Sequence, residues 1–381
     1  MQFNSRLKIY IIVGEESGEN LAYNLLTILR NKRRVALYGI GGERLKKLGL
    51  NPIFSYTRLS VMGLIEIIPK LPVLLYLINK TVRNIISVNP DLIITFDAPD
   101  FSFRVLNKIK RVNSDFKTLH VVAPTVWAWK AYRAKKISNY VDSLFVLFDF
   151  EKKYFTRHGI TTTTIRHPFL EKINNEIRKA PNLLKLDKKI ISIYPGSRKG
   201  EIKRHLNLIL KYISLGNYSK NYAFIIIAVD NYFDIISEIT YKYVQQLDIK
   251  VYKSSKYKHY AFKFSDYAIA VSGTVSLELA LCKIPLIVVY KLNKITYLIL
   301  RNLVKVKYVS LANIILNKKI IPELIQSELS YKNFNYELSN LINNNKFKKA
   351  QLKMFEKLRR IMSKKNKTTN AIALKKVLKL I

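Results

Sequence analysis

The stretch KIISIYPGSRKGE, residues 189–201, decides the fold of this chain, because a strand, a sharp turn and the start of a helix follow one another within it. Residues 190–194 are mostly apolar and β-branched, which is typical of a buried strand. Pro195 and Gly196 end this run, and a segment with helical spacing follows. If the unit repeats along the chain, it indicates a parallel β-sheet covered by helices.

The same pattern occurs on both sides of this stretch. Before it lie apolar runs that end in Gly, Pro or Asp, among them KIYIIVGEESGE (8–19), DLIITFDAPDF (91–101) and TLHVVAPTVWAW (118–129). After it lie YAFIIIAV (222–229), YAIAVSGTVSLELAL (267–281) and IPLIVVYKL (284–292). Because helix-length amphipathic segments separate these runs, we predict an α/β protein with two Rossmann-like, doubly wound domains that face a cleft.

The length of 381 residues also favours two domains, since single hydrophobic cores stop growing below this size. We place an N-terminal domain at 1–185 and a C-terminal domain at 186–345. Basic amphipathic helices at 346–381 complete the chain, and they pack either on the N-terminal domain or on a second subunit. The sequence leaves a monomer and a homodimer as alternatives.

The charge of the chain is strongly positive, with 66 Lys and Arg against 26 Asp and Glu and a formal net charge of +40. Such a charge attracts polyanions, including nucleic acid, anionic lipid and phosphorylated metabolites. A biased residue composition with a solvated basic surface explains the excess equally well. No helix-turn-helix, zinc-finger or RNP-like pattern accompanies the charge, so we expect no specific nucleic-acid partner.

Several further classes of protein are disfavoured by patterns that the sequence lacks. Cys282 is the only cysteine and the five histidines are scattered, so we expect no internal disulfide and no metal site. No stretch reaches the roughly 18 uncharged apolar residues that a spanning helix needs, so any membrane contact is expected to be peripheral. The glycine-bearing loops at 14–20 and 39–49 match neither the dinucleotide fingerprint nor a P-loop, and we expect no cofactor.

YPGSR predicts one half of a phosphate site. Gly196 and Ser197 free backbone amides at the turn after a strand, and Arg198 can donate two hydrogen bonds to phosphate oxygens. The alternative is an ordinary strand-to-helix turn with a surface arginine.

VSGTVSLELAL predicts the other half. Ser272, Gly273 and Thr274 open a helix at which a phosphate can approach the amides, and Glu278 can accept two hydrogen bonds from a ribose diol. Together the two loops predict a nucleoside-diphosphate pocket in the C-terminal domain. The alternative is a helix start with Glu278 as a partner of the helix dipole.

TFDAPDF supplies the candidate base. Asp97 follows a strand and can accept a proton from a hydroxyl nucleophile, provided that its pKa is raised toward neutrality. A helix N-cap is the competing interpretation, and for Asp100 it is the preferred one.

Two apolar features remain open between structural and binding roles. The segment 59–86 is long, apolar and interrupted by two prolines, so it is either a buried helix pair or a surface for acyl chains or a bilayer. Trp127 and Trp129 precede a run of cations, and they either shape a cleft wall or belong to the core.

Taken together, these motifs resemble one family, lipid-A-disaccharide synthase. The resemblance is carried, in family order from residue 14 to residue 316, by GEESGE, GIGGERL, LSVMGLIEIIPKLP, DAPDF, VAPTVWAW, FEKKYF, YPGSR, SGTVSLELAL and KYVSLANIIL. Each motif is weak alone, whereas the ordered set is specific.

The resemblance implies a GT-B type glycosyltransferase that acts by inversion and without a metal in lipid A biosynthesis, the pathway to the lipopolysaccharide of the Gram-negative outer membrane. UDP-2,3-diacylglucosamine would donate its sugar to the 6-hydroxyl of 2,3-diacylglucosamine 1-phosphate, giving a β-1,6 disaccharide and UDP. It also implies a cytoplasmic protein attached peripherally to the inner face of the cytoplasmic membrane. A UDP-sugar epimerase on the same architecture and a polyanion-binding protein are the alternatives.

The resemblance also implies roles for individual residues. Asp97 would be the general base, Arg198 with Gly196 and Ser197 would steady the leaving diphosphate, and Glu278 would hold the UDP ribose, while Ser272, Gly273 and Thr274 bind phosphate. Weaker candidates for the acceptor side or the cleft are Ser17, Glu15, Met62 and Asn313.

Three residues depart from the family pattern. Glu16 and Glu19 replace a small residue and an aspartate in the first loop, and Arg166 replaces a glycine before His167.

Overall fold

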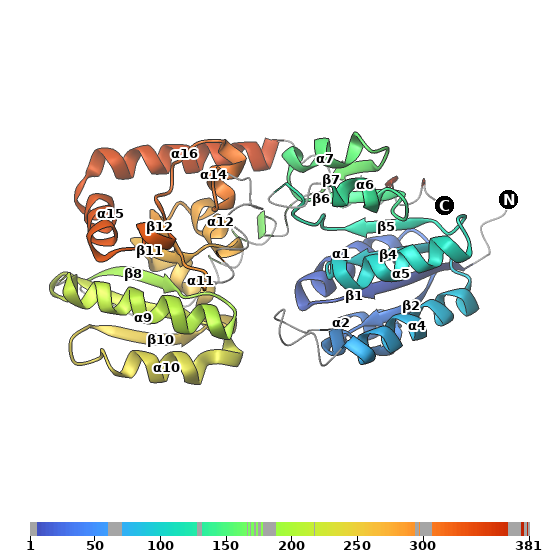
Figure 1. The fold of residues 1–381 in the computed structure, drawn as a ribbon, viewed down its shortest axis with the longest axis horizontal. Helices are drawn as coiled ribbons and strands as arrows, with labels where there is room; N and C mark the ends of the chain where they lie inside the picture. The colour runs from blue at the N-terminus through green and yellow to red at the C-terminus, as the bar shows by residue number, and fades with distance from the viewer. Residues whose placement is uncertain are drawn as a thin grey trace. The chain divides into compact units, whose positions relative to one another are not determined.

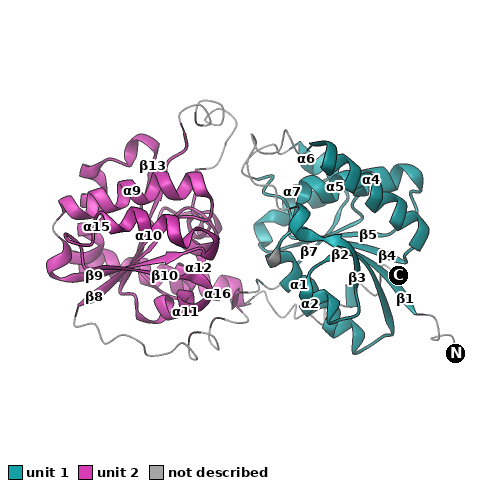
Figure 2. Ribbon diagram, turned by 90° about the horizontal axis from the view of Figure 1, so that it is seen from below, with its two compact units in different colours: residues 1–168, 365–381 teal, residues 169–364 magenta. Residues whose placement is uncertain are grey.

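The fold was determined as a computed structural model, which describes residues 6–59, 71–127, 132–165, 167, 169–170, 173, 177, 188–216, 218–293, 297, 307–364, 375–376 and 379. The chain forms two compact units (Figure 2). Unit 1 comprises Met1–Pro168 and Lys365–Ile381, and unit 2 comprises Phe169–Lys364.

Unit 1 is built on a parallel sheet whose strands run in the order β3-β2-β1-β4-β5-β6-β7. The strands are β1 (Leu7–Val13), β2 (Val35–Gly41), β3 (Asn51–Ser55), β4 (Leu92–Phe96), β5 (Thr118–Val121), β6 (Ser143–Val146) and β7 (Thr161–Thr164). The helices are α1 (Glu16–Arg30), α2 (Glu43–Lys46), α4 (Leu71–Val88), α5 (Pro99–Val112), α6 (Arg133–Ile137) and α7 (Lys152–Thr156), with short 3₁₀ helices η1 (Tyr56–Leu59) and η3 (Asp149–Glu151).

Unit 2 has a parallel sheet with the order β10-β9-β8-β11-β12-β13. Its strands are β8 (Lys189–Tyr194), β9 (Tyr222–Ala228), β10 (Ile249–Lys253), β11 (Tyr267–Val271), β12 (Leu286–Tyr290) and β13 (Glu323–Ile325). Its helices are α9 (Lys199–Leu215), α10 (Phe233–Tyr241), α11 (Ser254–Phe264), α12 (Thr274–Leu281), α14 (Leu311–Leu316), α15 (Tyr331–Asn343) and α16 (Asn345–Lys364), with 3₁₀ helices η4 (Tyr218–Lys220), η5 (Asp230–Tyr232) and η6 (Gln326–Glu328).

Both sheets share the strand order of a doubly wound fold. The first strand of each unit is central, the next two lie on one side of it, and the chain then crosses to the other side. Helices cover both faces of each sheet (Figure 1). The prediction of two Rossmann-like domains is therefore confirmed, whereas the cleft between them stays a prediction.

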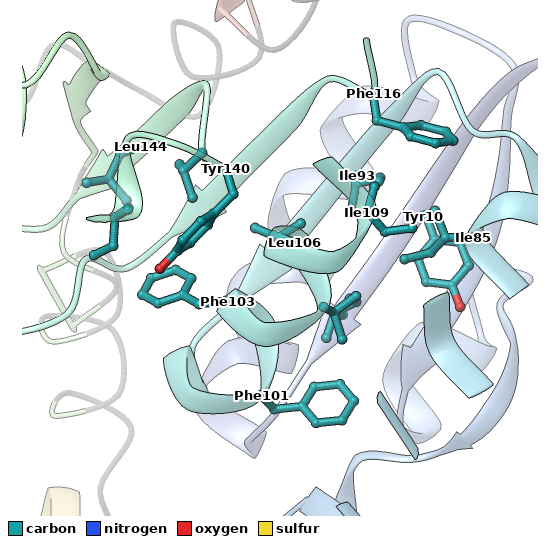
Figure 3. Packing of buried hydrophobic residues seen from close by; sticks show 14 of the residues in the cluster. Tyr10, Ile85, Ile93, Phe101, Phe103, Leu106, Ile109, Phe116, Tyr140 and Leu144 are labelled. Carbon is teal, nitrogen blue, oxygen red and sulfur yellow. The ribbon is translucent and has the colours of Figure 1, made fainter. Parts of the chain in front are cut away.

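The core of unit 1 follows from the two-residue period of its strands. In β1, Tyr10 and Ile12 enter the cluster beneath α4 and α5, while Ile9 and Ile11 enter the cluster beneath α1 on the opposite face. Figure 3 shows the first of these clusters, with Tyr10 packed among aromatic and aliphatic side chains. Because both faces are covered, the strands are almost continuously apolar, as the sequence indicated.

The C-terminal segment 346–381, predicted as basic helices, contributes to both units. Helix α16 packs on α12, α14 and α15 of unit 2, with Phe355 and Leu358 fully buried. The remainder is grouped with unit 1, where the Lys376 ammonium donates to Thr163 Oγ1 at 2.7 Å. The predicted boundary after residue 185 lies outside the described residues.

Residues 71–86 of the apolar segment 59–86 lie in helix α4. It buries Leu77, Ile78 and Ile85, but it leaves a second apolar face in solvent, formed by Leu71, Val73, Leu75, Tyr76 and Ile86. Residues 60–70, which include the candidate Met62, lie outside the described residues. Within the part of the chain that is described, no helix has the length and apolarity needed to cross a membrane.

Candidate active site

Asp97 lies at the carboxyl end of β4, in a turn that the backbone holds in an unusual conformation. Asp97 and Ala98 have φ angles of 51° and 42°, in the left-handed region that is uncommon for residues other than glycine. The turn is held by two bonds, from Asp97 N to Val121 O at 3.3 Å and from Ser102 Oγ to Asp97 O at 3.1 Å. Such conformations cluster at functional sites, where surrounding structure maintains them.

The Asp97 carboxyl group has the properties expected of a general base. It is half-buried, and the Ser17 hydroxyl donates a hydrogen bond to its Oδ2 at 3.1 Å. Burial raises the pKa of Asp97 to about 6, the Ser17 hydrogen bond opposes that rise, and the charge of Glu15 adds to it. A carboxylate with such a pKa is ionised near neutral pH and yet basic enough to accept a proton.

Asp100 is not the helix cap that the sequence favoured. The residue before the first turn of α5 is Ala98, which has no capping side chain, and Asp100 lies inside that turn. Its exposed carboxylate forms an ion pair with Arg133 at 2.9 Å. The N-cap interpretation of Asp100 is therefore wrong, because Pro99 begins the helix one residue earlier.

Two glycines of GEESGE bring the loop after β1 against the Asp97 turn. A Cβ atom on Gly14 would lie 2.0 Å from the Ala98 Cβ, and one on Gly18 would lie 3.3 Å from Asp97 Oδ2. A side chain at Gly14 would force the two loops apart, whereas one at Gly18 would crowd the Asp97 carboxylate. Ser17 and Glu15 are both exposed at this edge of the sheet.

Glu19, one of the departures from the family pattern, has a defined structural role. Its buried Oε1 accepts hydrogen bonds from the backbone amides of Gly42, Arg44 and Leu45 at 2.9, 3.1 and 3.2 Å. These amides begin helix α2, so the carboxylate satisfies donors that the helix itself leaves unpaired. Glu19 thereby ties GIGGERL to GEESGE, a link that sequence spacing did not reveal. The side chain of Glu16 and residue Arg166 lie outside the described part.

In unit 2 the two predicted phosphate loops lie next to each other, because β8 and β11 are neighbours in the sheet. Gly196 has a φ of +110°, and a Cβ there would lie 3.6 Å from Val271 Cγ1, just before the second loop. Ser197 and Arg198 are exposed, and Arg198 precedes the first residue of α9. Its guanidinium is 3.3 Å from Glu201 Oε1, in a pair whose arginine side chain is exposed and whose glutamate is mostly buried.

The second loop leaves backbone amides accessible at the start of α12. Gly273 and Thr274 are exposed, while the Ser272 hydroxyl donates to Val309 O at 3.2 Å. Among the described residues no side chain caps this helix, which leaves its first amides available to an anion. The structure thus brings the predicted diphosphate residues to one edge of unit 2.

Glu278 and Asn313 are more constrained than the sequence suggested. Glu278 is only 9% exposed, and its Oε2 lies 2.6 Å from the Lys258 ammonium of α11. The buried Asn313 amide donates to Ile321 O and Glu323 Oε1 and accepts from two backbone amides at 320–321. All four hydrogen-bonding positions of that amide are thus used within the protein. Lys258 escaped sequence analysis because nothing in its own neighbourhood marks it.

Comparison with known proteins agrees with this geometry. The family model described as lipid-A-disaccharide synthetase matches residues 9–377. Lipid-A-disaccharide synthase of Rickettsia prowazekii is 35% identical over 376 residues, covering 97% of this chain and 98% of the relative. The enzyme of Rhodospirillum centenum is 30% identical over 353 residues, covering 91% and 88%.

Solved structures show the same architecture at low sequence identity. UDP-GlcNAc 2-epimerase of Neisseria meningitidis has a TM-score of 0.67 and 12% identity, covering 98% of this chain and all of the other. MurG of Acinetobacter baumannii has a TM-score of 0.57 and 11% identity, with coverage of 98% and 100%. At such identities only the fold is shared, including with the epimerases.

The two doubly wound units have the fold of the GT-B class. More narrowly, the chain belongs to the lipid-A-disaccharide synthase family, and it is a hexosyl-transferring enzyme of lipid A disaccharide formation. The resemblance carried by the ordered motifs is confirmed.

Proposed function

We propose that this enzyme transfers the sugar of UDP-2,3-diacylglucosamine to the 6-hydroxyl of 2,3-diacylglucosamine 1-phosphate, with inversion at the anomeric carbon. The observation that supports the acceptor side is Asp97, a half-buried carboxyl group with a pKa raised to about 6 and a hydroxyl donor at hydrogen-bonding distance. UDP as the donor's leaving group is supported by the two adjacent phosphate loops of unit 2 and by the related fold of an epimerase that was solved with bound UDP-GlcNAc.

In the proposed reaction Asp97 removes the proton from the acceptor 6-hydroxyl as its oxygen attacks the anomeric carbon of the donor. The bond between that carbon and the diphosphate breaks, and UDP leaves with the electron pair. Arg198 and the first amides of α12 stabilise the charge that develops on the diphosphate. Glu278 accepts hydrogen bonds from the ribose, and Lys258 orients it. Asn313 acts indirectly, by holding the segment around Glu323.

In the experiment, three purified proteins are each incubated with both substrates in the absence of divalent metal. Mass spectrometry then detects the disaccharide. The native enzyme is expected to form product, Asp97→Asn to lose at least about 100-fold in kcat, and Asp91→Asn to stay near native. Asp91 is the matched control because it precedes the same strand at the opposite edge, where it accepts from Lys8 N at 2.8 Å.

The thermal stability of Asp97→Asn distinguishes a loss of catalysis from a loss of folding. The pKa of Asp97 is higher in the folded protein than the ordinary 3.8, so the folded state is penalised when this group ionises above about pH 6. Asp97→Asn should therefore unfold at the same or a higher temperature than native protein at pH 8. Product formation by Asp97→Asn at the native rate would remove Asp97 as the base.

We further propose peripheral attachment to the inner face of the cytoplasmic membrane through helix α4. Its exposed face carries Val73, Leu75 and Tyr76, with exposures of 56, 46 and 63%, and the exposed cations Lys80 and Arg83 lie on the same helix. Apolar side chains bordered by cations suit an anionic bilayer surface, where the acylated substrates reside. A monomer and a homodimer remain the two alternatives for the enzyme.

A further inference from the structure

Glu151 is a buried carboxylate that the proposed chemistry does not use. It ends η3, just after β6, within the FEKKYF motif, and it is only 3% exposed. One oxygen accepts a hydrogen bond from Phe148 N at 3.0 Å, which closes the turn locally. The other accepts from the indole Nε1 of Trp127 at 3.3 Å. Burying a carboxylate is unfavourable unless such partners compensate, and burial raises the pKa of Glu151 to about 7.

Trp127 ends a segment that begins beside Asp97. The segment 122–127 leaves β5 at Val122, whose φ of 75° is an outlier for a β-branched residue. The preceding Val121 carbonyl accepts the backbone amide of Asp97 itself. One end of this segment is therefore attached to the turn of the proposed base, and Glu151 holds the other end through the indole.

The indole also continues a row of aromatic rings. Trp127 packs edge-on against Phe150 at 5.4 Å, and Phe150 stacks on Phe148 at 5.7 Å with an angle of 9° between the rings. All three rings are partly exposed. Because β4, β5 and β6 are parallel, the loops that carry these rings leave the same edge of the sheet as Asp97.

We propose that Glu151 is a positioning residue for the acceptor: it holds the Trp127 indole, and with it the segment 122–127, in the orientation that presents the acylated aminosugar to Asp97. This inference rests on the proposed acceptor reaction. It joins VAPTVWAW, whose role the sequence left open between a cleft wall and the core, to FEKKYF, to which the sequence assigned no role.

The test varies the acceptor concentration and compares Glu151→Ala with Glu151→Gln. Glu151→Ala should raise the acceptor KM by about tenfold, as expected when one hydrogen bond to a charged group no longer orients the site. Its affinity for UDP should not change. Glu151→Gln gives up the bond from Phe148 N but keeps one oxygen that can accept the indole N–H, so it should restore the KM to within about twofold of native.

The matched control is Asp142→Ala. Asp142 is likewise a carboxylate next to β6, but it precedes the strand and accepts from Thr118 N at 2.8 Å and from Thr118 Oγ1 at 2.9 Å. This variant should lower the unfolding temperature and leave the acceptor KM unchanged. If both variants raise the KM equally, Glu151 is merely structural and the inference fails.

Fluorescence tests the indole contact without catalysis. In a Trp129→Phe background, Trp127 is the only tryptophan. Adding Glu151→Ala should increase its quenching by acrylamide, whereas adding Glu151→Gln should not. If quenching is unchanged, Glu151 does not hold Trp127 and the inference is overturned, even if the native enzyme forms no disaccharide. Increased quenching with an unchanged acceptor KM also overturns it.

A second variant covers the case in which Glu151→Ala does not fold. Trp127→Phe keeps the carboxylate and an aromatic ring but removes the indole donor, so it should raise the acceptor KM as Glu151→Ala would and leave the affinity for UDP unchanged. A folded Trp127→Phe protein with a native acceptor KM would contradict the inference.

Discussion

At the scale of single residues, Asp97 and Ser17 show how a sequence motif becomes a reactive group. The motif DAPDF indicates a carboxylate after a strand, but burial and the hydroxyl partner come from a loop 80 residues earlier in the chain. Burial favours the neutral acid and Ser17 favours the carboxylate. The balance leaves a carboxyl group with a pKa of about 6, which suits the proposed role of general base.

The pH dependence of activity follows from that balance. In the proposed mechanism the ionised carboxylate of Asp97 is the active form, so kcat/KM should increase as pH rises through about 6. Ser17→Ala removes a hydrogen bond that lowers the pKa, so the acidic limb should move to higher pH, by roughly half to one unit. Profiles of kcat/KM against pH for the two proteins measure this shift.

Ser102→Ala is the control for that experiment. It removes a bond to the Asp97 backbone carbonyl, not to its carboxylate. Its acidic limb should therefore coincide with that of the native enzyme. A limb that moves to lower pH in Ser17→Ala would show that Ser17 does not stabilise the ionised form.

At the scale of elements, the loops after β1 and β4 must contact each other for Ser17 to reach Asp97. Gly14 leaves no room for a Cβ atom against Ala98, and Ala98 itself has a left-handed φ. Sequence analysis recognised both loops as site candidates because they end parallel strands. It could not show that they touch, since strand order in the sheet decides which loops are neighbours.

Gly14→Ala should therefore destabilise the enzyme by about 2–3 kcal/mol through overpacking, and Ala98→Gly should relieve the clash in the double variant. The single Ala98→Gly change should be neutral or stabilising by about 1 kcal/mol, because glycine adopts the left-handed conformation without penalty. Chemical denaturation of the native enzyme, the two single variants and the double variant gives the coupling energy between the two positions. Additive effects would mean that these two positions are not in contact in the folded protein.

At the scale of the whole molecule, the formal charge of +40 and the apolar face of α4 would make separable contributions to the proposed membrane binding. Electrostatic attraction to anionic lipid is screened by salt, whereas burial of apolar side chains is not. The same charge would bind nucleic acid, but only through salt-sensitive phosphate contacts.

Sedimentation with anionic phospholipid vesicles at low and high salt should separate these contributions. The native enzyme should bind at low salt and retain part of its binding at physiological salt. Leu75→Gln combined with Tyr76→Gln should lose the salt-resistant part, while Lys203→Gln on unit 2 serves as a charge control. Binding to DNA that persists at physiological salt, without vesicle binding, would instead favour the polyanion alternative.

The sequence by itself determined the fold class, the family and most of the candidate site. Apolar runs that end in Gly, Pro or Asp report local strand ends, and a parallel sheet necessarily gathers those ends at one edge. Asp97, Arg198 and the loop at 272–274 could therefore be identified from their positions after strands.

Only the tertiary structure decided which partners these residues have. Three contacts join segments that are distant in sequence or have no periodic pattern. They link Glu19 to the start of α2, Lys258 to Glu278, and Glu151 to Trp127. The same holds for Asn313, whose amide is fully used inside the protein. Burial, pKa and hydrogen-bond partners depend on packing between elements, and no spacing along the chain encodes that packing directly.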